Sequence, residues 1–135
     1  MNFDRMLAPW QPAILSLFRF VTGLLLLQFG VAKWLKFPAV PAFANPAPLS
    51  LTAGALELIG GTLLVVGLFT RPVAFILSGL MACAYFIGHV FKAAPVWLPL
   101  LNGGTPAIAF CFMCLLLAAT GGGPISLDAI VRRKA

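Results

Sequence analysis

Four polar side chains near the ends of apolar runs are the residues of this chain that could do chemistry. Glu57 lies within GALELIGGTLLVVGLFTR, residues 54–71, which otherwise consists almost entirely of apolar and small residues. Lys33, His89 and Asn102 accompany other apolar runs. A carboxylate, an ammonium, an imidazole and an amide can hold the polar head of a ligand, and the carboxylate or imidazole can exchange a proton with it. Whether they do so depends on the elements that position them.

The composition is that of a membrane protein. Hydrophobic residues make up 61% of the 135 residues and charged residues only 9%, which is far from the balance of a soluble domain. The formal net charge is +6, but the basic residues are scattered and form no patch for nucleic acid. The first apolar run continues past Arg19 to about Leu35, so we expect a retained membrane anchor and not a cleaved signal.

Four apolar segments are candidates for spanning helices, which need roughly 20 residues each. They cover residues 12–37, 49–69, 72–91 and 106–120. The fourth is short, and the apolar WLPLL at residues 97–101 could complete it. The sequence therefore predicts an all-α fold: a single domain of four transmembrane helices in a bundle. A tail over residues 121–135 would follow, with its apolar residues toward lipid and its RRK cluster toward anionic headgroups.

The distribution of basic residues predicts the orientation. With four spans, both termini lie on one side of the membrane. That side carries Arg5, Arg19, Arg71, Arg132, Arg133 and Lys134, and the other side carries Lys33, Lys36 and Lys92. This bias indicates that both termini are cytoplasmic. Arg19 and Arg71 would then be anchors that reach to the headgroups.

Glycines share helix faces with the charged residues. At about 100° per residue, Arg19, Gly23, Gly30 and Lys33 fall on one stripe of the first span. Gly54, Glu57 and Gly61 fall on one stripe of the second. Because small residues let membrane helices approach closely, we expect these four glycines to pack helix against helix and both charges to point into the bundle.

The positions of the polar residues along the spans suggest one shared site. Lys33, Glu57 and His89 all lie toward the outer ends of their spans, and Asn102 follows in the outer loop. In an up-and-down bundle they would meet in the outer half of the membrane. Two interpretations stay open: Lys33 and Glu57 form an ion pair that only holds two helices together, or the four residues bind a ligand.

Other motifs are weaker. Cys111 and Cys114 match the CxxC pattern, but they begin more than a turn inside an apolar helix, where nothing stabilises a thiolate. No spacing of His, Cys or carboxylates predicts a metal site. We therefore assign no metal and no catalytic residue.

The order and spacing of several segments resemble the DoxX family of small bacterial inner-membrane proteins. The stretches RFVTGLLLLQFGVAKWLKF and ELIGGTLLVVGLFTRP carry the first part of the resemblance, and His89 the next. NGGTPAIAFCFMCLLLAATGGGPISLD, which includes Asn102 and Asp128, resembles the closing stretch. In two places the chain departs from the family: Thr105 stands where an acidic residue is usual, and Phe110 where tyrosine is common.

The resemblance implies a multi-pass protein of the bacterial inner membrane that is associated with redox chemistry. Family members are linked to quinone-dependent sulfur oxidation and to membrane oxidoreductase complexes. We therefore expect a subunit of a quinone-linked oxidoreductase, with quinone as the ligand of Lys33, Glu57, His89 and Asn102. Its partners would be membrane lipid, a membrane or periplasmic redox protein and a second copy of the chain. The alternatives are a non-enzymatic membrane partner or assembly factor and a small transporter.

Overall fold

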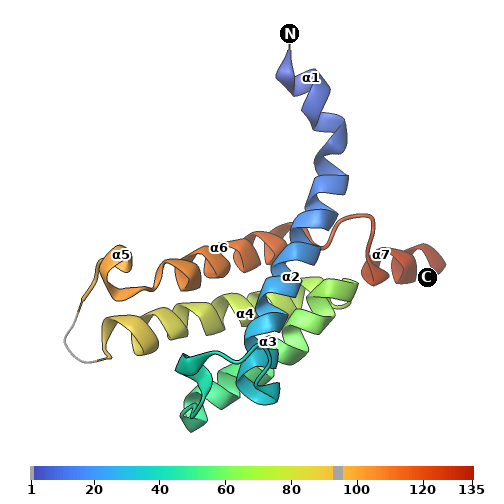
Figure 1. The fold of residues 1–135 in the computed structure, drawn as a ribbon. Coiled ribbons are helices and arrows are strands. Elements are labelled where there is room, and N and C mark those ends of the chain that lie inside the picture. Colours follow the sequence, from blue (N-terminus) through green and yellow to red (C-terminus); the bar gives the residue numbers. More distant parts are fainter. Residues whose placement is uncertain (1, 93–95) are drawn as a thin grey trace.

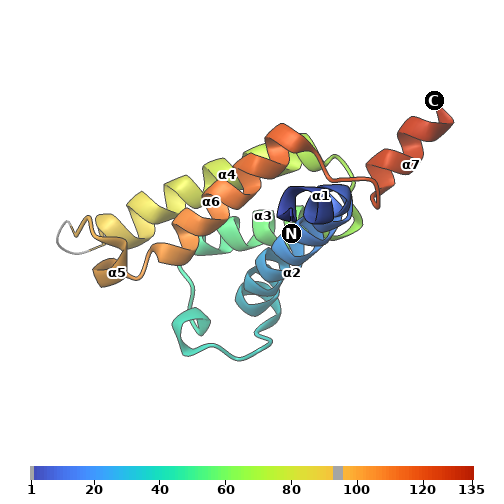
Figure 2. The same ribbon diagram turned by 90° about the horizontal axis from the view of Figure 1, so that it is seen from above.

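The computed structural model describes residues 2–92 and 96–135, and this part of the chain is helical, without strands (Figures 1 and 2). The all-α expectation is confirmed. The elements in chain order are α1 (Phe3–Leu7), η1 (Ala8–Trp10), α2 (Gln11–Leu35), η2 (Pro41–Phe43), α3 (Pro48–Val66), α4 (Thr70–Tyr85), η3 (Phe86–Val90), α5 (Pro99–Asn102), α6 (Thr105–Thr120) and α7 (Leu127–Lys134). The element η3 is a π-helix that continues α4.

Three helical segments of the described residues are long and apolar enough to cross a membrane. They are Phe3–Leu35, Pro48–Val66 and Thr70–Val90. The first extends over 33 residues because α1 and η1 run into α2, so it begins well before the expected residue 12. The fourth candidate, α6, is apolar but shorter. The number of spans and the side on which the termini lie therefore stay predictions.

The helices form two hairpins that cross. α2 packs along α3, and α4 packs along α6 (Figures 1 and 2). The hairpins meet where α3 turns into α4, and from there they diverge. As a result, the end of α2 with the start of α3 lies apart from the end of α4 with the start of α6 (Figure 1).

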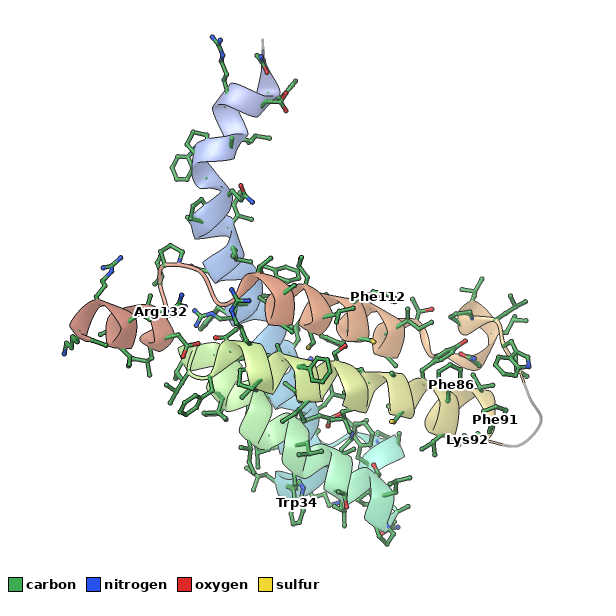
Figure 3. All side chains as sticks on the ribbon, turned by 180° about the vertical axis from the view of Figure 1, so that it is seen from behind. Trp34, Phe86, Phe91, Lys92, Phe112 and Arg132 are labelled. Carbon is green, nitrogen blue, oxygen red and sulfur yellow. The ribbon has the colours of Figure 1, made fainter. Side chains whose placement is uncertain are left out.

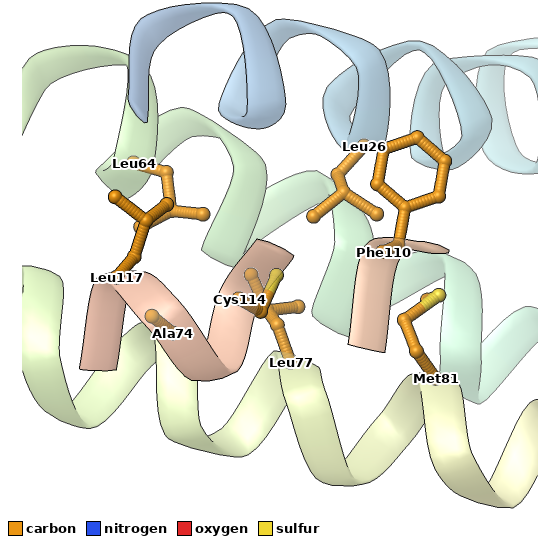
Figure 4. Close-up of a cluster of buried hydrophobic side chains, with 8 residues drawn as sticks. All are labelled: Leu26, Leu64, Ala74, Leu77, Met81, Phe110, Cys114 and Leu117. Carbon is orange, nitrogen blue, oxygen red and sulfur yellow. The ribbon is translucent and has the colours of Figure 1, made fainter. Parts of the chain in front are cut away.

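A compact apolar core fills the crossing of the hairpins. Its buried side chains come from α2, α3, α4 and α6, and Figure 4 shows how they interlock: Leu26, Leu64, Ala74, Leu77, Met81, Phe110, Cys114 and Leu117. Phe110 also packs edge-on against Phe29, with ring centroids 6.1 Å apart. Aliphatic side chains meeting at close packing fix how the two hairpins cross.

Large apolar side chains cover the outside of the helices, as a bilayer requires. Trp34, Phe86, Phe91 and Phe112 are all about half or more exposed, and Figure 3 shows them pointing away from the bundle. In water such a surface would be a liability, whereas in lipid it costs nothing.

Polar bonds join α4 to α6 along their length. The hydroxyl of Ser78 donates to the backbone oxygen of Cys111 at 2.8 Å. Where α4 begins and α6 ends, Arg71 donates to the backbone oxygens of Ala119 and Thr120, at 2.6 and 3.3 Å. Arg71 therefore caps the end of α6, whose carbonyls have no partner within the helix. This role, and not only anchoring to headgroups, explains an arginine at this position.

Candidate functional site

Close approach of α2 and α3 positions the candidate site. A Cβ atom at Gly30 would stand 2.5 Å from the backbone nitrogen of Leu58, and one at Gly61 would stand 2.7 Å from that of Leu27. Only hydrogen fits at such distances, so the two backbones pack directly against each other. The glycines that we expected to pack helix against helix all lie at this contact: Gly23, Gly30, Gly54 and Gly61.

Lys33 and Glu57 form a buried ion pair across this contact. Nζ of Lys33 donates to both carboxylate oxygens of Glu57, at 2.7 and 3.0 Å, and the two side chains are only 10% and 5% exposed. Gly54 leaves space for the side chain of Lys33, because a Cβ atom at position 54 would stand 2.9 Å from Cδ of Lys33. Each charge thereby satisfies the other in a segment where an isolated charge is costly.

The connection between α2 and α3 folds over the ion pair. The ring centroid of Phe43 lies 5.4 Å from Nζ of Lys33, within the range of a cation–π contact. Lys36 fixes the connection by donating to the backbone oxygens of Phe43 and Ala44, at 2.8 and 3.2 Å. The proline-rich segment 37–47 is therefore an ordered cover for Lys33.

An open hollow of about 360 Å³ lies beside this cover. Its lining is apolar except for one ammonium: Ala32, Lys36, Ala39, Val40, Pro41, Phe43 and Ala44. Phe43 belongs to both places, since it is one of the residues lining the hollow and its ring lies over Lys33. The ammonium group of Lys33 has three N–H donors and uses two of them in hydrogen bonds to Glu57, so one donor is left for another group.

His89 and Asn102 form a second polar group on the other hairpin. Nδ1 of His89 lies 3.1 Å from the backbone oxygen of Asn102, and Oδ1 of Asn102 accepts from the backbone N–H of Gly104 at 2.8 Å. His89 lies in the π-helix, an irregularity often found at functional sites.

The four predicted site residues therefore form two pairs and not the single patch that we expected. Figure 3 shows the separation through Trp34, next to Lys33, and Phe91, near His89, which lie at the ends of different hairpins. The reason is the crossing of the hairpins, which carries their ends apart. A role in ligand binding stays a prediction for each pair.

The two cysteines of the CxxC pattern have a structural place in the core. Cys114 is fully buried, and both it and Cys111 are free thiols. In residues 2–92 and 96–135, no three His, Cys, Asp or Glu side chains lie close enough together to hold a metal ion.

Arg19 belongs to a third polar cluster, which sequence reasoning missed. We expected a lipid anchor, but Arg19 is only 4% exposed. Its Nη2 donates to the backbone oxygen of Ile125 at 2.8 Å, and its guanidinium packs directly on Gly67, where the φ of +73° and the lack of a side chain allow the contact. The C-terminal tail returns to cover this arginine, and hydrophobic periodicity carries no sign of that return.

Asp128 ties the tail to the turn between α3 and α4. Its carboxylate oxygens accept from the backbone N–H groups of Phe69 and Thr70, both at 2.8 Å, and so cap the start of α4. Burial raises the pKa of this carboxyl, but the hydrogen bonds from Thr70 and Phe69 and the charge of Arg132 outweigh burial and hold the pKa below its ordinary value. Ser126 caps α7, since its hydroxyl oxygen accepts a hydrogen bond from the backbone N–H of Ala129 at 3.2 Å.

Comparison with known proteins fits this architecture. The family model described as DoxX matches residues 14–90, which include Lys33, Glu57 and His89. The chain belongs to the DoxX family. An uncharacterized protein of Haemophilus influenzae is 38% identical over 125 residues, covering 90% of this chain and 93% of that protein. Inner membrane protein YphA of Escherichia coli is 29% identical over 130 residues, covering 87% and 90%.

No solved structure matches the chain significantly. Family membership, the relative named as an inner membrane protein and the apolar helices together make this DoxX-family chain a small multi-pass protein of the inner membrane.

Proposed function

We propose that this DoxX-family protein is a membrane subunit that binds a hydrophobic redox ligand, a quinone, at the Lys33–Glu57 pair. One observation carries the proposal: the ring of Phe43 lies over the buried ammonium of Lys33, and Phe43 is also one of the residues that line an apolar hollow of about 360 Å³. A hollow of this size, with a few polar groups beside apolar walls, has the character of a small-molecule site.

Each residue has a distinct part in the proposal. Lys33 donates its remaining proton to a ligand oxygen, and Glu57 holds the ammonium in place through two hydrogen bonds. Phe43 provides a flat apolar surface for the ligand ring. A bound quinone supplies two-electron redox chemistry, and the electrons come from a membrane or periplasmic redox partner. His89 and Asn102 lie on the other hairpin and are not required at this site.

The test is to purify the full chain in mild detergent and to quantify the extracted quinone by mass spectrometry. We expect close to one quinone per protein in the native chain and little in Glu57→Gln or Phe43→Ala. His89→Gln is the matched control on the other hairpin and keeps its quinone. Phe43→Ala leaves both charges in place, so a loss in this variant cannot come from an unpaired lysine. The absence of quinone from the native chain would overturn the proposal.

A second function is favoured by how fully the two charges satisfy each other. Both carboxylate oxygens bond the same ammonium between glycine-packed helices, as expected for a pair that only holds α2 and α3 in register. The protein would then be a non-enzymatic membrane partner or assembly factor. In that case Glu57→Gln lowers stability, and no variant changes a bound ligand. For a transporter the two residues give opposite indications, since Glu57 lies at the middle of α3 whereas Lys33 lies two residues from the end of α2.

A further inference from the structure

Three arginines surround the loop that joins α6 to α7. A Cβ atom at Gly121 would stand 3.5 Å from Nε of Arg71, and one at Gly122 would stand 3.0 Å from Cδ of Arg19. Arg132, on α7, lies beside the same loop (Figure 3). Glycines therefore let the side chains of Arg71 and Arg19 come close to one short stretch of backbone, which Arg132 also borders.

The positive charge of this cluster exceeds the negative charge around it. Among the described residues, the ion pair at contact distance is formed by Lys33 and Glu57, at the opposite end of the α2–α3 hairpin, and does not involve these arginines. The acid nearest the arginines is Asp128, and each of its carboxylate oxygens accepts a hydrogen bond from the backbone at the start of α4. Two nitrogens of Arg19, Nε and Nη1, are buried without a hydrogen-bond partner. Three arginines therefore face one carboxylate, whose charge acts on Arg19 and Arg132 but leaves positive charge in excess, so the site favours an anion.

A hollow of about 330 Å³ opens at this cluster. Arg132 contributes the charge to its lining, the glycine loop contributes backbone, and Leu15, Pro124 and Ala129 contribute apolar wall. The main lining residues are Leu15, Thr120, Gly122, Gly123, Pro124 and Arg132. Charge at one side and apolar wall at the other suit an amphiphile better than a free ion.

The exposed face of α7 places this hollow at the membrane surface. Leu127, Ile130 and Val131 are 40%, 48% and 58% exposed, whereas Asp128 and Ala129 are turned toward the bundle and half-buried. The protein therefore leaves the apolar face of α7 uncovered, and Figure 1 shows the helix extending away from the hairpins. A helix with this pattern lies in the headgroup layer. The hollow then lies at the depth of lipid phosphates.

We propose that the loop of residues 120–124 and Arg132 form a binding site for the headgroup of an anionic phospholipid. Arg132 contacts the phosphate, and Arg71 and Arg19 add positive potential from the side and from behind. The apolar face of α7 and Leu15 lie along the acyl chains. This site is independent of the quinone proposal, because it lies at the other end of the α2–α3 hairpin.

Native mass spectrometry of the full chain in neutral detergent tests the site. The probes are dioleoylphosphatidylglycerol and dioleoylphosphatidylcholine, titrated separately. We expect tighter binding of the phosphatidylglycerol. Arg132→Gln should weaken it about fivefold, the effect of one basic residue near a membrane surface. Arg133→Gln is the matched control, since it removes the same charge from the next residue, and it should change binding less than about twofold.

Three results would overturn the proposal. Equal weakening by Arg132→Gln and Arg133→Gln would mean diffuse attraction to the basic tail and no defined site. Equal affinity for the two lipids would mean that charge does not matter. Free glycerol phosphate forming an adduct as readily as phosphatidylglycerol would mean that the ligand is a soluble phosphate ester. Because Arg132 is exposed, its variant should keep the elution volume and helical circular dichroism of the native protein, and both are recorded as folding controls.

Discussion

The two ends of the α2–α3 hairpin handle charge in opposite ways. At the loop end, under segment 37–47, Lys33 and Glu57 cancel within one bidentate contact. At the tail end, where the C-terminal tail meets the α3–α4 turn, Arg19 is as deeply buried but bonds only a backbone oxygen. The loop end therefore offers a matched ion pair beside a hollow with a single ammonium, that of Lys36, and the tail end offers a larger excess of positive charge.

This difference teaches what each end can bind. A matched ion pair exerts little field at a distance, so the loop end suits an uncharged ligand that takes one remaining hydrogen bond. Unmatched arginines keep their field and suit an anion. Buried charge by itself therefore does not identify a ligand, and the partner of each charge must be known first.

Breaking the pair at the loop end should have the largest effect. Glu57→Leu leaves the buried ammonium of Lys33 unpaired, and we expect the free energy of unfolding to fall by about 3–5 kcal/mol. Adding Lys33→Met to the same chain should restore most of this loss, because no charge is then buried. Reversible unfolding in mixed micelles of mild detergent and dodecyl sulfate measures both. If the double variant were as unstable as the single one, charge matching would not explain the pair.

Adding a side chain to the close contact between α2 and α3 should have the next largest effect. In Gly30→Ala the new Cβ atom would stand 2.5 Å from the backbone nitrogen of Leu58, so α2 and α3 must separate, at about 1–3 kcal/mol. Gly79→Ala is the matched control within α4, because nothing lies within 4 Å of its added Cβ. The same unfolding assay applies. Equal effects of the two substitutions would contradict the close backbone contact.

Releasing the tail should have a smaller effect that is confined to its own end. Asp128→Asn weakens the cap on Phe69 and Thr70, at about 1 kcal/mol, and residues 121–135 should become more accessible to protease. Asp4→Asn removes an exposed acid of α1 and serves as the control. Limited proteolysis followed by intact mass measurement reports the release. Unchanged cleavage in Asp128→Asn would show that the tail is held by other contacts.

Acid should produce the smallest effect. The pKa of Asp128 is lower in the folded protein than its ordinary value, so its contribution to stability is present above an ordinary aspartate pKa near ~3.9 and is lost as the pH falls through the folded value. The stability difference between the native chain and Asp128→Asn should therefore be constant near neutral pH and shrink below about pH 4. Groups common to both chains cancel in this difference. A difference that grows on acidification would give the opposite sign for the pKa change.

Sequence was a good guide to features that act along single helices. Apolar runs predicted the long helices, and the spacing of Gly30, Lys33, Gly54 and Glu57 placed them on faces that do meet. The separation of His89 from Glu57 was not predictable, because the crossing of the hairpins is decided by side chains packed from four helices. The stripe shared with Gly23 and Gly30 pointed Arg19 inward, but the lipid-anchor role expected for it was wrong, since its partner is in a tail that returns from more than 100 residues away.

The most direct test compares what co-purifies with the native chain, Glu57→Gln and Arg132→Gln in one mass-spectrometric measurement of quinone and phospholipid. The account predicts a crossed result: Glu57→Gln loses quinone and keeps phosphatidylglycerol, whereas Arg132→Gln keeps quinone and retains less phosphatidylglycerol than the native chain. Loss of both ligands from both variants, or no change in either, would contradict the claim that the two ends of the hairpin are separate sites.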